Sequence, residues 1–276
     1  MSGRKLAVIT GATSGIGREF ARRLAPDCNL IISGRREAKL RELAEELQAE
    51  HGGSVRVVIA DLSEIEELDR LLTIISDAPA LEYLVNNAGF GSFGGFAEVP
   101  CELHRTMLDV HCRAPMELIC AALPKMKEAG RGNIINTSSI ASFMPLPKSG
   151  IYSASKAFLR DLTETLAAEY GGVGIRFQAL CPGMTRTDFH TRLGRPEDKV
   201  YRSRGLFRAQ TSEEVVDYSL KCLKKDKVIC IPGLGNRIIV WNMRHLPRPF
   251  VRRLMRKKLK QAEARRRAAN HPESSR

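Results

Sequence analysis

The chain has 276 residues, of which 43% are hydrophobic and 27% charged, and this balance excludes a wholly disordered protein. It carries 44 Lys and Arg against 31 Asp and Glu, a formal net charge of +13 that suits contact with nucleic acid, an anionic membrane or acidic substrates. Seven cysteines without C-x-x-C or metal-ligand spacing exclude a disulfide scaffold and a zinc module. We therefore expect buried thiols, no metal site and a cytoplasmic, reducing location.

Short runs rich in Val, Ile and Leu alternate with helix-period segments along most of the chain. Such alternation is typical of a parallel sheet covered by helices on both faces, so we expect one α/β, doubly wound domain over residues 1–236. Strands are expected at 6–9, 30–32, 55–59, 81–85, 133–136, 175–180 and 228–231. Helices are expected to follow the first three strands, ending near residue 25 and spanning about 36–50 and 63–75.

A glycine-rich loop joins the first expected strand to the first expected helix. Its sequence is Thr10-Gly11-Ala12-Thr13-Ser14-Gly15-Ile16-Gly17. The spacing G-x-x-x-G-x-G differs from G-x-G-x-x-G, but glycines still allow close approach of the backbone to a pyrophosphate. The helix that follows offers free N–H groups and the positive end of its dipole. We therefore expect a dinucleotide-phosphate site that includes all of these residues except Ala12 and Thr13.

Two arginines follow the second expected strand, in Ser33-Gly34-Arg35-Arg36. Many NAD sites place an acidic residue here to accept a hydrogen bond from the ribose 2′-hydroxyl, whereas an arginine pairs with a 2′-phosphate. Because this position holds no acid, Arg35 and Arg36 predict NADP(H) rather than NAD(H). The alternative is an ordinary basic helix N-terminus, which the helix dipole disfavours.

Tyr152 and Lys156 lie four residues apart at the start of an expected helix, so their side chains share one face. A free tyrosine has a pKa of about 10, too high for a ready proton acceptor at neutral pH. A nearby ammonium stabilises the phenolate, so Lys156 is expected to lower the pKa of Tyr152 and make it an acid/base for a carbonyl/alcohol pair.

These motifs and three more resemble the short-chain dehydrogenase/reductase family. The others are Asn86-Asn87-Ala88-Gly89, Ser138-Ser139 and Pro182-Gly183-Met184-Thr185-Arg186-Thr187, which follow the fourth, fifth and sixth expected strands. The resemblance runs from about residue 5 to residue 232. It implies a Rossmann-type sheet of seven parallel strands and NAD(P)-dependent interconversion of alcohols and carbonyls.

The resemblance also implies roles for individual residues. Ser139 would hydrogen-bond the substrate oxygen, Tyr152 would transfer the proton, and Lys156 would bind the ribose hydroxyls and tune Tyr152. The cofactor would further contact residues that follow the strands, namely Asp61, Leu62, Asn87, Ala88, Gly89, Pro182, Gly183, Thr185 and Thr187.

One position departs from the family pattern. The family usually has an asparagine in a Val-Asn pair that holds a water of the proton relay, whereas His111 follows Val110 here. Imidazole can donate and accept, so His111 either serves the relay as a catalytic residue or fills the space.

In this family the segment after Pro182-Gly183, here about 184–210, usually closes over the substrate as a lid. It combines apolar residues with a net charge of +4, and Phe90, Phe93 and Phe96 lie on another loop near the site. The lid is either a solvated loop or part of a site for a ketone, a steroid-like compound or a keto group on an anionic carrier such as coenzyme A.

The leading hypothesis is an NADP(H)-dependent oxidoreductase acting on a small hydrophobic carbonyl or alcohol, as a homodimer or homotetramer. The alternative is a noncatalytic nucleotide-binding or membrane-associated scaffold.

Residues 237–276 form a basic C-terminal extension with a net charge of +11, which leaves +2 on residues 1–236. Apolar residues at helical spacing predict an amphipathic helix whose one face carries Phe250, Val251, Leu254, Met255, Leu259 and Ala262. Such a helix packs on its own domain or a second subunit, or lies on an anionic membrane. No recognised nucleic-acid-binding module accompanies the charge, so we expect no nucleic acid.

Overall fold

A computed structural model describes residues 4–78, 81–188 and 205–270. Seven parallel strands form one sheet, as expected from the sequence, and their order is β3-β2-β1-β4-β5-β6-β7. The strands are β1 Lys5–Thr10, β2 Cys28–Gly34, β3 Val55–Ile59, β4 Leu81–Asn86, β5 Gly132–Thr137, β6 Ile175–Leu180 and β7 Ile229–Cys230. The order reverses between β1 and β4, and in open parallel sheets ligands bind at the carboxyl ends of the strands beside such a point.

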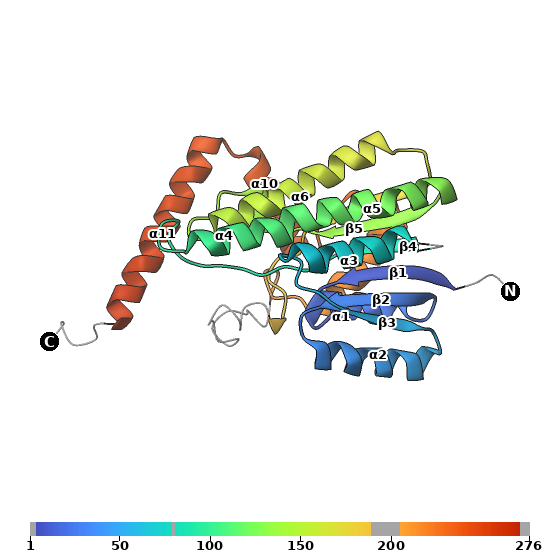
Figure 1. Ribbon diagram of the computed structural model, residues 1–276. Helices are drawn as coiled ribbons and strands as arrows, with labels where there is room; N and C mark the ends of the chain where they lie inside the picture. The colour runs from blue at the N-terminus through green and yellow to red at the C-terminus, as the bar shows by residue number, and fades with distance from the viewer. Residues whose placement is uncertain (1–3, 79–80, 189–204, 271–276) are drawn as a thin grey trace.

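Helices cover both faces of this sheet, as Figure 1 shows. They are α1 Gly15–Leu24, α2 Glu37–His51, α3 Ile65–Ser76, α4 Cys101–Leu108, α5 Ala114–Ala129, α6 Gly150–Glu169, α9 Ser212–Leu223, α10 Leu234–His245 and α11 Arg248–Asn270. A π-helical turn, Asp109–Arg113, joins α4 to α5, and a short 3-10 turn, Ile140–Phe143, follows β5.

The two faces of the sheet have separate apolar cores because successive strand residues point to opposite sides. Ala7 and Ile9 of β1 pack with α1, α2 and α9, whereas Val8 packs with α3 and α5. The spacing of Leu40, Leu43 and Leu47 predicted a helix, and all three are buried on the first face. The apolar cores on the two faces hold the sheet between the helices, and the carboxyl ends of β1, β4, β5 and β6 therefore lie together at one edge of the sheet.

The C-terminal extension begins differently from the expected boundary at residues 236/237. α10 starts at Leu234, and its Val240 is buried in a third apolar cluster with Phe143, Ala179 and Cys181. The middle of α10 therefore packs in the same core as the end of β6.

α11 lies at one side of the molecule, as the red helix of Figure 1, and only part of its expected apolar face is covered. Val251 and Met255 are buried, whereas Phe250 is 53% exposed. In the parts of the chain that the structure describes, no helix is long and apolar enough to cross a membrane. All seven cysteines are free, but Cys101 and Cys120 are exposed, which corrects the expectation that every thiol is buried.

Candidate active site

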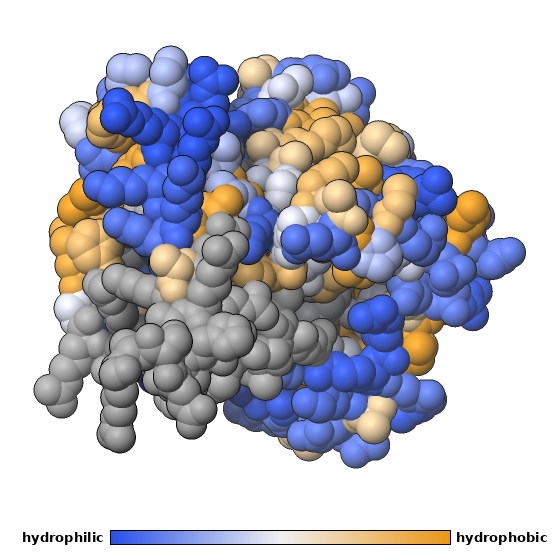
Figure 2. Space-filling view, turned by 90° about the vertical axis from the view of Figure 1, so that its left-hand side faces the viewer, coloured by the Kyte–Doolittle hydropathy of each residue, from blue (hydrophilic) through white to orange (hydrophobic). Residues whose placement is uncertain are grey.

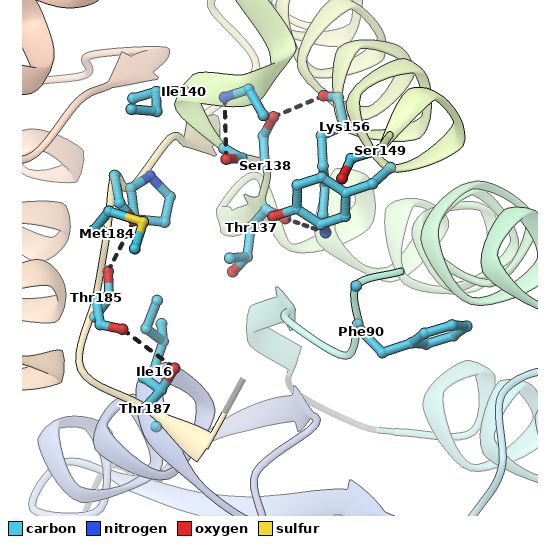
Figure 3. Close-up of a pocket in the computed structure, with 18 of the residues that line it drawn as sticks. Ile16, Phe90, Thr137, Ser138, Ile140, Ser149, Lys156, Met184, Thr185 and Thr187 are labelled. Carbon is cyan, nitrogen blue, oxygen red and sulfur yellow. Dashed lines mark hydrogen bonds between the residues drawn. The ribbon is translucent and has the colours of Figure 1, made fainter. Parts of the chain in front are cut away.

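A cavity of about 510 Å³ opens at the carboxyl ends of the strands. Its walls come from the glycine loop, from the segments that follow β4, β5 and β6, and from the start of α6. Figure 3 shows Lys156, Thr137 and Ser138 on one side of this cavity and Thr185, Thr187 and Ile16 on another. Motifs separated by more than a hundred residues in the sequence thus line one space.

The glycine loop has the geometry that a pyrophosphate needs. Gly11 and Gly15 adopt positive φ angles of 67° and 58°, a region that side chains disfavour. A Cβ atom on Gly17 would overlap the Asn87 amide and the Gly11 carbonyl oxygen. Ser14 does not cap α1 with its side chain, and the first turn of α1 holds no acidic residue, so its N–H groups suit an anion.

Thr10 and Asn87 join the loop to the sheet. The Thr10 hydroxyl accepts hydrogen bonds from the N–H groups of Asn87 and Ala88, at 3.0 and 3.1 Å. The Asn87 amide donates to the carbonyl oxygens of Thr10 and Gly11 and accepts from the Thr137 hydroxyl. Both side chains therefore hold the ends of β1, β4 and β5 in place.

Hydrogen bonds join the start of α6 to the end of β5. Lys156 is 4% exposed, and its Nζ donates to the Thr137 carbonyl oxygen at 2.8 Å. The Ser138 hydroxyl donates to the Lys156 carbonyl oxygen at 2.7 Å, while the Ser139 hydroxyl accepts from the Ala141 N–H and faces Tyr152. Ser139, Tyr152 and Lys156 therefore lie together on the cavity wall, as their spacing in the sequence suggests.

The pKa of Tyr152 differs from the sequence-based expectation. Burial raises the pKa of Tyr152 above its ordinary value, and the hydrogen bond with Ser139 lowers it by less. Lys156 does not lower it here, because Lys156 Nζ is directed to Thr137 and lies 6.0 Å from the centre of the tyrosine ring. Burial also lowers the pKa of Lys156 to about 8. At neutral pH the phenol is therefore protonated and suited to donate a proton.

His111 lies in the π-helical turn, fully buried beside this wall. Its Nε2 accepts a hydrogen bond from the Phe90 N–H at 3.0 Å, and its Nδ1 lies 3.0 Å from the Ser155 hydroxyl. Burial lowers the pKa of His111 well below its ordinary range, and Lys156 lowers it further. The imidazole is therefore neutral, and both of its nitrogens contact protein groups.

The two arginines after β2 point to different partners. Arg36 donates to the hydroxyls of Thr13 and Ser14, at 2.7 and 2.8 Å, and pairs with Asp188 at 3.2 Å. Arg35 instead pairs with Asp61 at 3.0 Å. Burial raises the pKa of Asp61, but hydrogen bonds from Ser63 and Arg35 outweigh it and hold that pKa below its ordinary value. Leu62, next to Asp61, is buried in the core.

The turn after β6 passes over the glycine loop. A Cβ atom on Gly15 would lie 2.7 Å from the Thr187 side chain, and the Thr185 hydroxyl donates to the Gly183 carbonyl oxygen. A Cβ atom on Gly183 would overlap the side chain of Asn236, which donates to Gln210 and to the Pro232 carbonyl oxygen. Sequence reasoning missed Asn236, because it placed the end of the catalytic body at this residue.

The loop after β4 contributes less aromatic surface than expected. Phe90 and Phe93 both line the cavity, but Phe90 also packs against the core beneath it. Phe96 is 70% exposed and stacks on His104. Of the expected lid, residues 189–204 lie outside the described part of the chain. Met184 lines the cavity, as do Ile140, Met144 and Leu146.

A parallel sheet with a glycine loop at its switch point, beside a half-buried tyrosine and a buried lysine, defines a dinucleotide-dependent oxidoreductase. The sequence profile described as short chain dehydrogenase matches residues 5–198. The chain belongs to the short-chain dehydrogenase/reductase family. It is therefore an enzyme type that interconverts carbonyls and alcohols with a nicotinamide cofactor.

Individual relatives agree with this assignment. Sulfoacetaldehyde reductase 2 of Chromohalobacter salexigens is 36% identical over 78% of this chain and 87% of that protein. A short-chain dehydrogenase from Sphingobium yanoikuyae, solved with NADPH, has a TM-score of 0.78 and 30% identity, over 86% of this chain and 92% of that one. A solved 7β-hydroxysteroid dehydrogenase has a TM-score of 0.82 and 28% identity, over 91% and 96%. Solved members of the family hold NADP or NAD.

Proposed function

We propose that this protein is an NADP(H)-dependent reductase of a hydrophobic ketone. The observation that carries the proposal is the single cavity that joins the glycine loop to Ser139, Tyr152 and Lys156. A bound dihydronicotinamide supplies the hydride in this chemistry. The protein supplies the proton, the position of the carbonyl group and a site from which apolar side chains exclude water.

Each of the three polar side chains has a distinct task. The Ser139 hydroxyl donates a hydrogen bond to the carbonyl oxygen, and Tyr152 donates its phenolic proton to the same oxygen as negative charge develops there. Because burial raises the pKa of Tyr152, the phenol holds this proton at neutral pH. The Lys156 ammonium, which the Thr137 carbonyl oxygen holds at the cavity wall, would donate hydrogen bonds to the ribose hydroxyls of the cofactor.

Arg36 supports the choice of NADP(H) over NAD(H). Its guanidinium lies against the hydroxyls of the glycine loop, so a 2′-phosphate on the adenosine ribose would meet a cation and two hydroxyl donors. Arg35 is held by Asp61 and is 60% exposed, so it contributes less. Asp188 pairs with Arg36, so its carboxylate would have to give way to the phosphate.

His111 is proposed to position two elements rather than to carry protons. The acceptor at Nε2 holds the Phe90 backbone, and the Nδ1–H donates to Ser155, whose hydroxyl donates to the Tyr152 carbonyl oxygen at 3.0 Å. A Cβ atom on Gly89 would lie 2.9 Å from His111 Nε2 and 3.4 Å from Lys156 Nζ, so the backbone at this glycine passes close to both side chains. His111 therefore ties the loop after β4 to the helix that carries Tyr152.

The substrate is proposed to be a ketone with an apolar body, of steroid-like size or linked to an acyl carrier. Apolar side chains line the end of the cavity beyond the catalytic residues, namely Phe93, Ile140, Met144, Leu146 and Met184. A screen that follows NADPH absorbance over simple ketones, ketosteroids and 3-ketoacyl-CoA compounds tests this directly. Turnover confined to small hydrophilic aldehydes would contradict the proposal.

We also propose that the enzyme is cytoplasmic and forms a homodimer or homotetramer. Large apolar side chains are exposed on α4, α5 and α6, namely Leu103, Leu108, Met116 and Phe158. A second copy would remove them from water. Light scattering that gives the mass of one chain at micromolar concentration would contradict the oligomer.

A further inference from the structure

One face of α10 carries an apolar stripe in contact with water. Leu234, Ile238 and Trp241 recur at i, i+4 and i+7, so they share one face, and their exposed fractions are 55%, 38% and 61%. The opposite side of the same helix is covered, because Val240 is buried in the core. His245 continues the stripe by one turn, and its ring stacks on Trp241 with the ring centres 4.6 Å apart.

Basic side chains surround this stripe and continue along α11. Residues 237–260 contain nine Lys and Arg and no acidic residue. Arg237, Arg244, Arg252, Arg253 and Arg256 are exposed. Among the described residues, none of these five forms a salt bridge. Figure 2 looks onto the side from which α11 projects, and hydrophilic surface runs down its upper left part beside hydrophobic surface at the left edge.

We propose that α10 and the start of α11 bind the surface of an anionic lipid bilayer. Arg237 and Arg244 lie over the rings of Tyr218 and Phe143, but their charges, like those of the arginines on α11, are not neutralised by a described carboxylate. Exposed arginines of this kind gain from the negative potential of such a surface, and exposed aliphatic and indole groups gain by leaving water at the headgroup level. Indole suits this depth because its ring is apolar while its N–H remains hydrogen-bonded. The inference concerns where the enzyme sits and does not depend on the proposed substrate.

The combination of charge and apolar surface favours an anionic bilayer over a second copy of the chain and over a nucleic acid. A second copy that docked face to face would bring two clusters of like charge together, which is unfavourable. A nucleic acid would satisfy the arginines but would leave Leu234, Ile238 and Trp241 without an apolar partner. An anionic bilayer offers partners to both kinds of side chain.

Trp241 is the only tryptophan of the chain, so intrinsic fluorescence reports directly on the stripe. The full-length protein is titrated with vesicles of phosphatidylcholine alone and of phosphatidylcholine with phosphatidylserine, at low and high salt. We expect a blue shift of the tryptophan emission and co-sedimentation with the anionic vesicles only, reversed by salt. Emission that stays unchanged with both kinds of vesicle would overturn the proposal.

Two variants test separately the contributions of the basic side chains and of the apolar stripe to membrane binding. Arg252→Glu/Arg253→Glu should weaken co-sedimentation with anionic vesicles by about tenfold or more. Arg41→Glu/Arg70→Glu serves as the control, because it makes the same charge change on exposed residues of α2 and α3. Ile238→Asn should reduce the blue shift. A blue shift that depends on protein concentration without vesicles would mean self-association, and one produced by duplex DNA alone would mean nucleic-acid binding. Either result overturns the proposal.

Discussion

Two arginines follow β2 beside the glycine loop, and their guanidinium groups have different partners. Arg35 and Arg36 are adjacent and chemically identical, yet one pairs with Asp61 and the other with the hydroxyls of the glycine loop. The sequence could predict a cationic site after β2, but not which guanidinium occupies it. The direction of each side chain depends on partners that lie far along the chain.

This division gives a prediction for cofactor choice. Arg36→Leu removes the cation at the proposed 2′-phosphate site, so we expect the KM for NADPH to rise about tenfold or more and the KM for NADH to change little. Arg41→Leu, on the helix α2 that begins directly after Arg36, is the control and should alter neither. Steady-state kinetics with both cofactors measures this, and an equal loss for NADPH and NADH would contradict the role of Arg36.

The buried imidazole gives a second prediction. His111→Phe fills a similar space but leaves the Phe90 N–H and the Ser155 hydroxyl without their partner, so we expect a lower Tm and a large loss of kcat. His111→Asn keeps a polar group and should retain turnover within a few fold. If His111 instead carried protons, the asparagine variant would lose turnover and the shape of the pH profile would change.

The lowered pKa of Lys156 gives a third prediction, in which activity and stability change in opposite directions. The ammonium is present below a pH of about 8 and is lost above it, so reduction should slow as pH rises through that value. Between about 8 and the ordinary lysine value of 10.5 the unfolded chain binds more protons than the folded one, so this group makes the free energy of unfolding rise with pH. Reductase rates and urea unfolding in the same buffers test both, and activity that is constant throughout this interval would contradict the assignment.

At the scale of helices and strands, most of the fold could be predicted from the sequence. Short runs of Val, Ile and Leu indicated the strands, helical spacing indicated the helices, and the family resemblance indicated a sheet of seven parallel strands. The pattern at 250–262 predicted a single apolar face, but Phe250 is exposed while Val251 is buried. Periodicity states which residues share a face, whereas packing decides how much of that face is covered.

α10 also has a role that spacing could not indicate, because Asn236 packs against the turn after β6. Gly183→Ala places a Cβ atom against the Asn236 side chain, so we expect a fall of several degrees in Tm and reduced cofactor binding. Gly150→Ala is the control, since no atom lies within 4 Å of its added Cβ. Adding Asn236→Ala to Gly183→Ala should recover part of the loss, and strict additivity in thermal unfolding would contradict the contact.

For the whole molecule, charge and chemistry are separated along the chain. The sequence places +2 on residues 1–236 and +11 on the remainder, and the cavity with its catalytic side chains lies in the first part. Most of the net charge therefore lies outside the part of the chain that forms the cavity. The charged C-terminal segment is nevertheless not a separate module, because Val240, Val251 and Met255 on α10 and α11 are buried.

The central claim is that Tyr152 donates the proton in an NADPH-dependent reduction. Tyr152→Phe removes one hydroxyl and keeps the ring, so it should abolish NADPH turnover with the best ketone of the screen while NADPH binding, followed by fluorescence, stays within a few fold. A noncatalytic scaffold would show no turnover even in the unaltered protein. Tyr152→Phe with unaltered turnover would contradict the account.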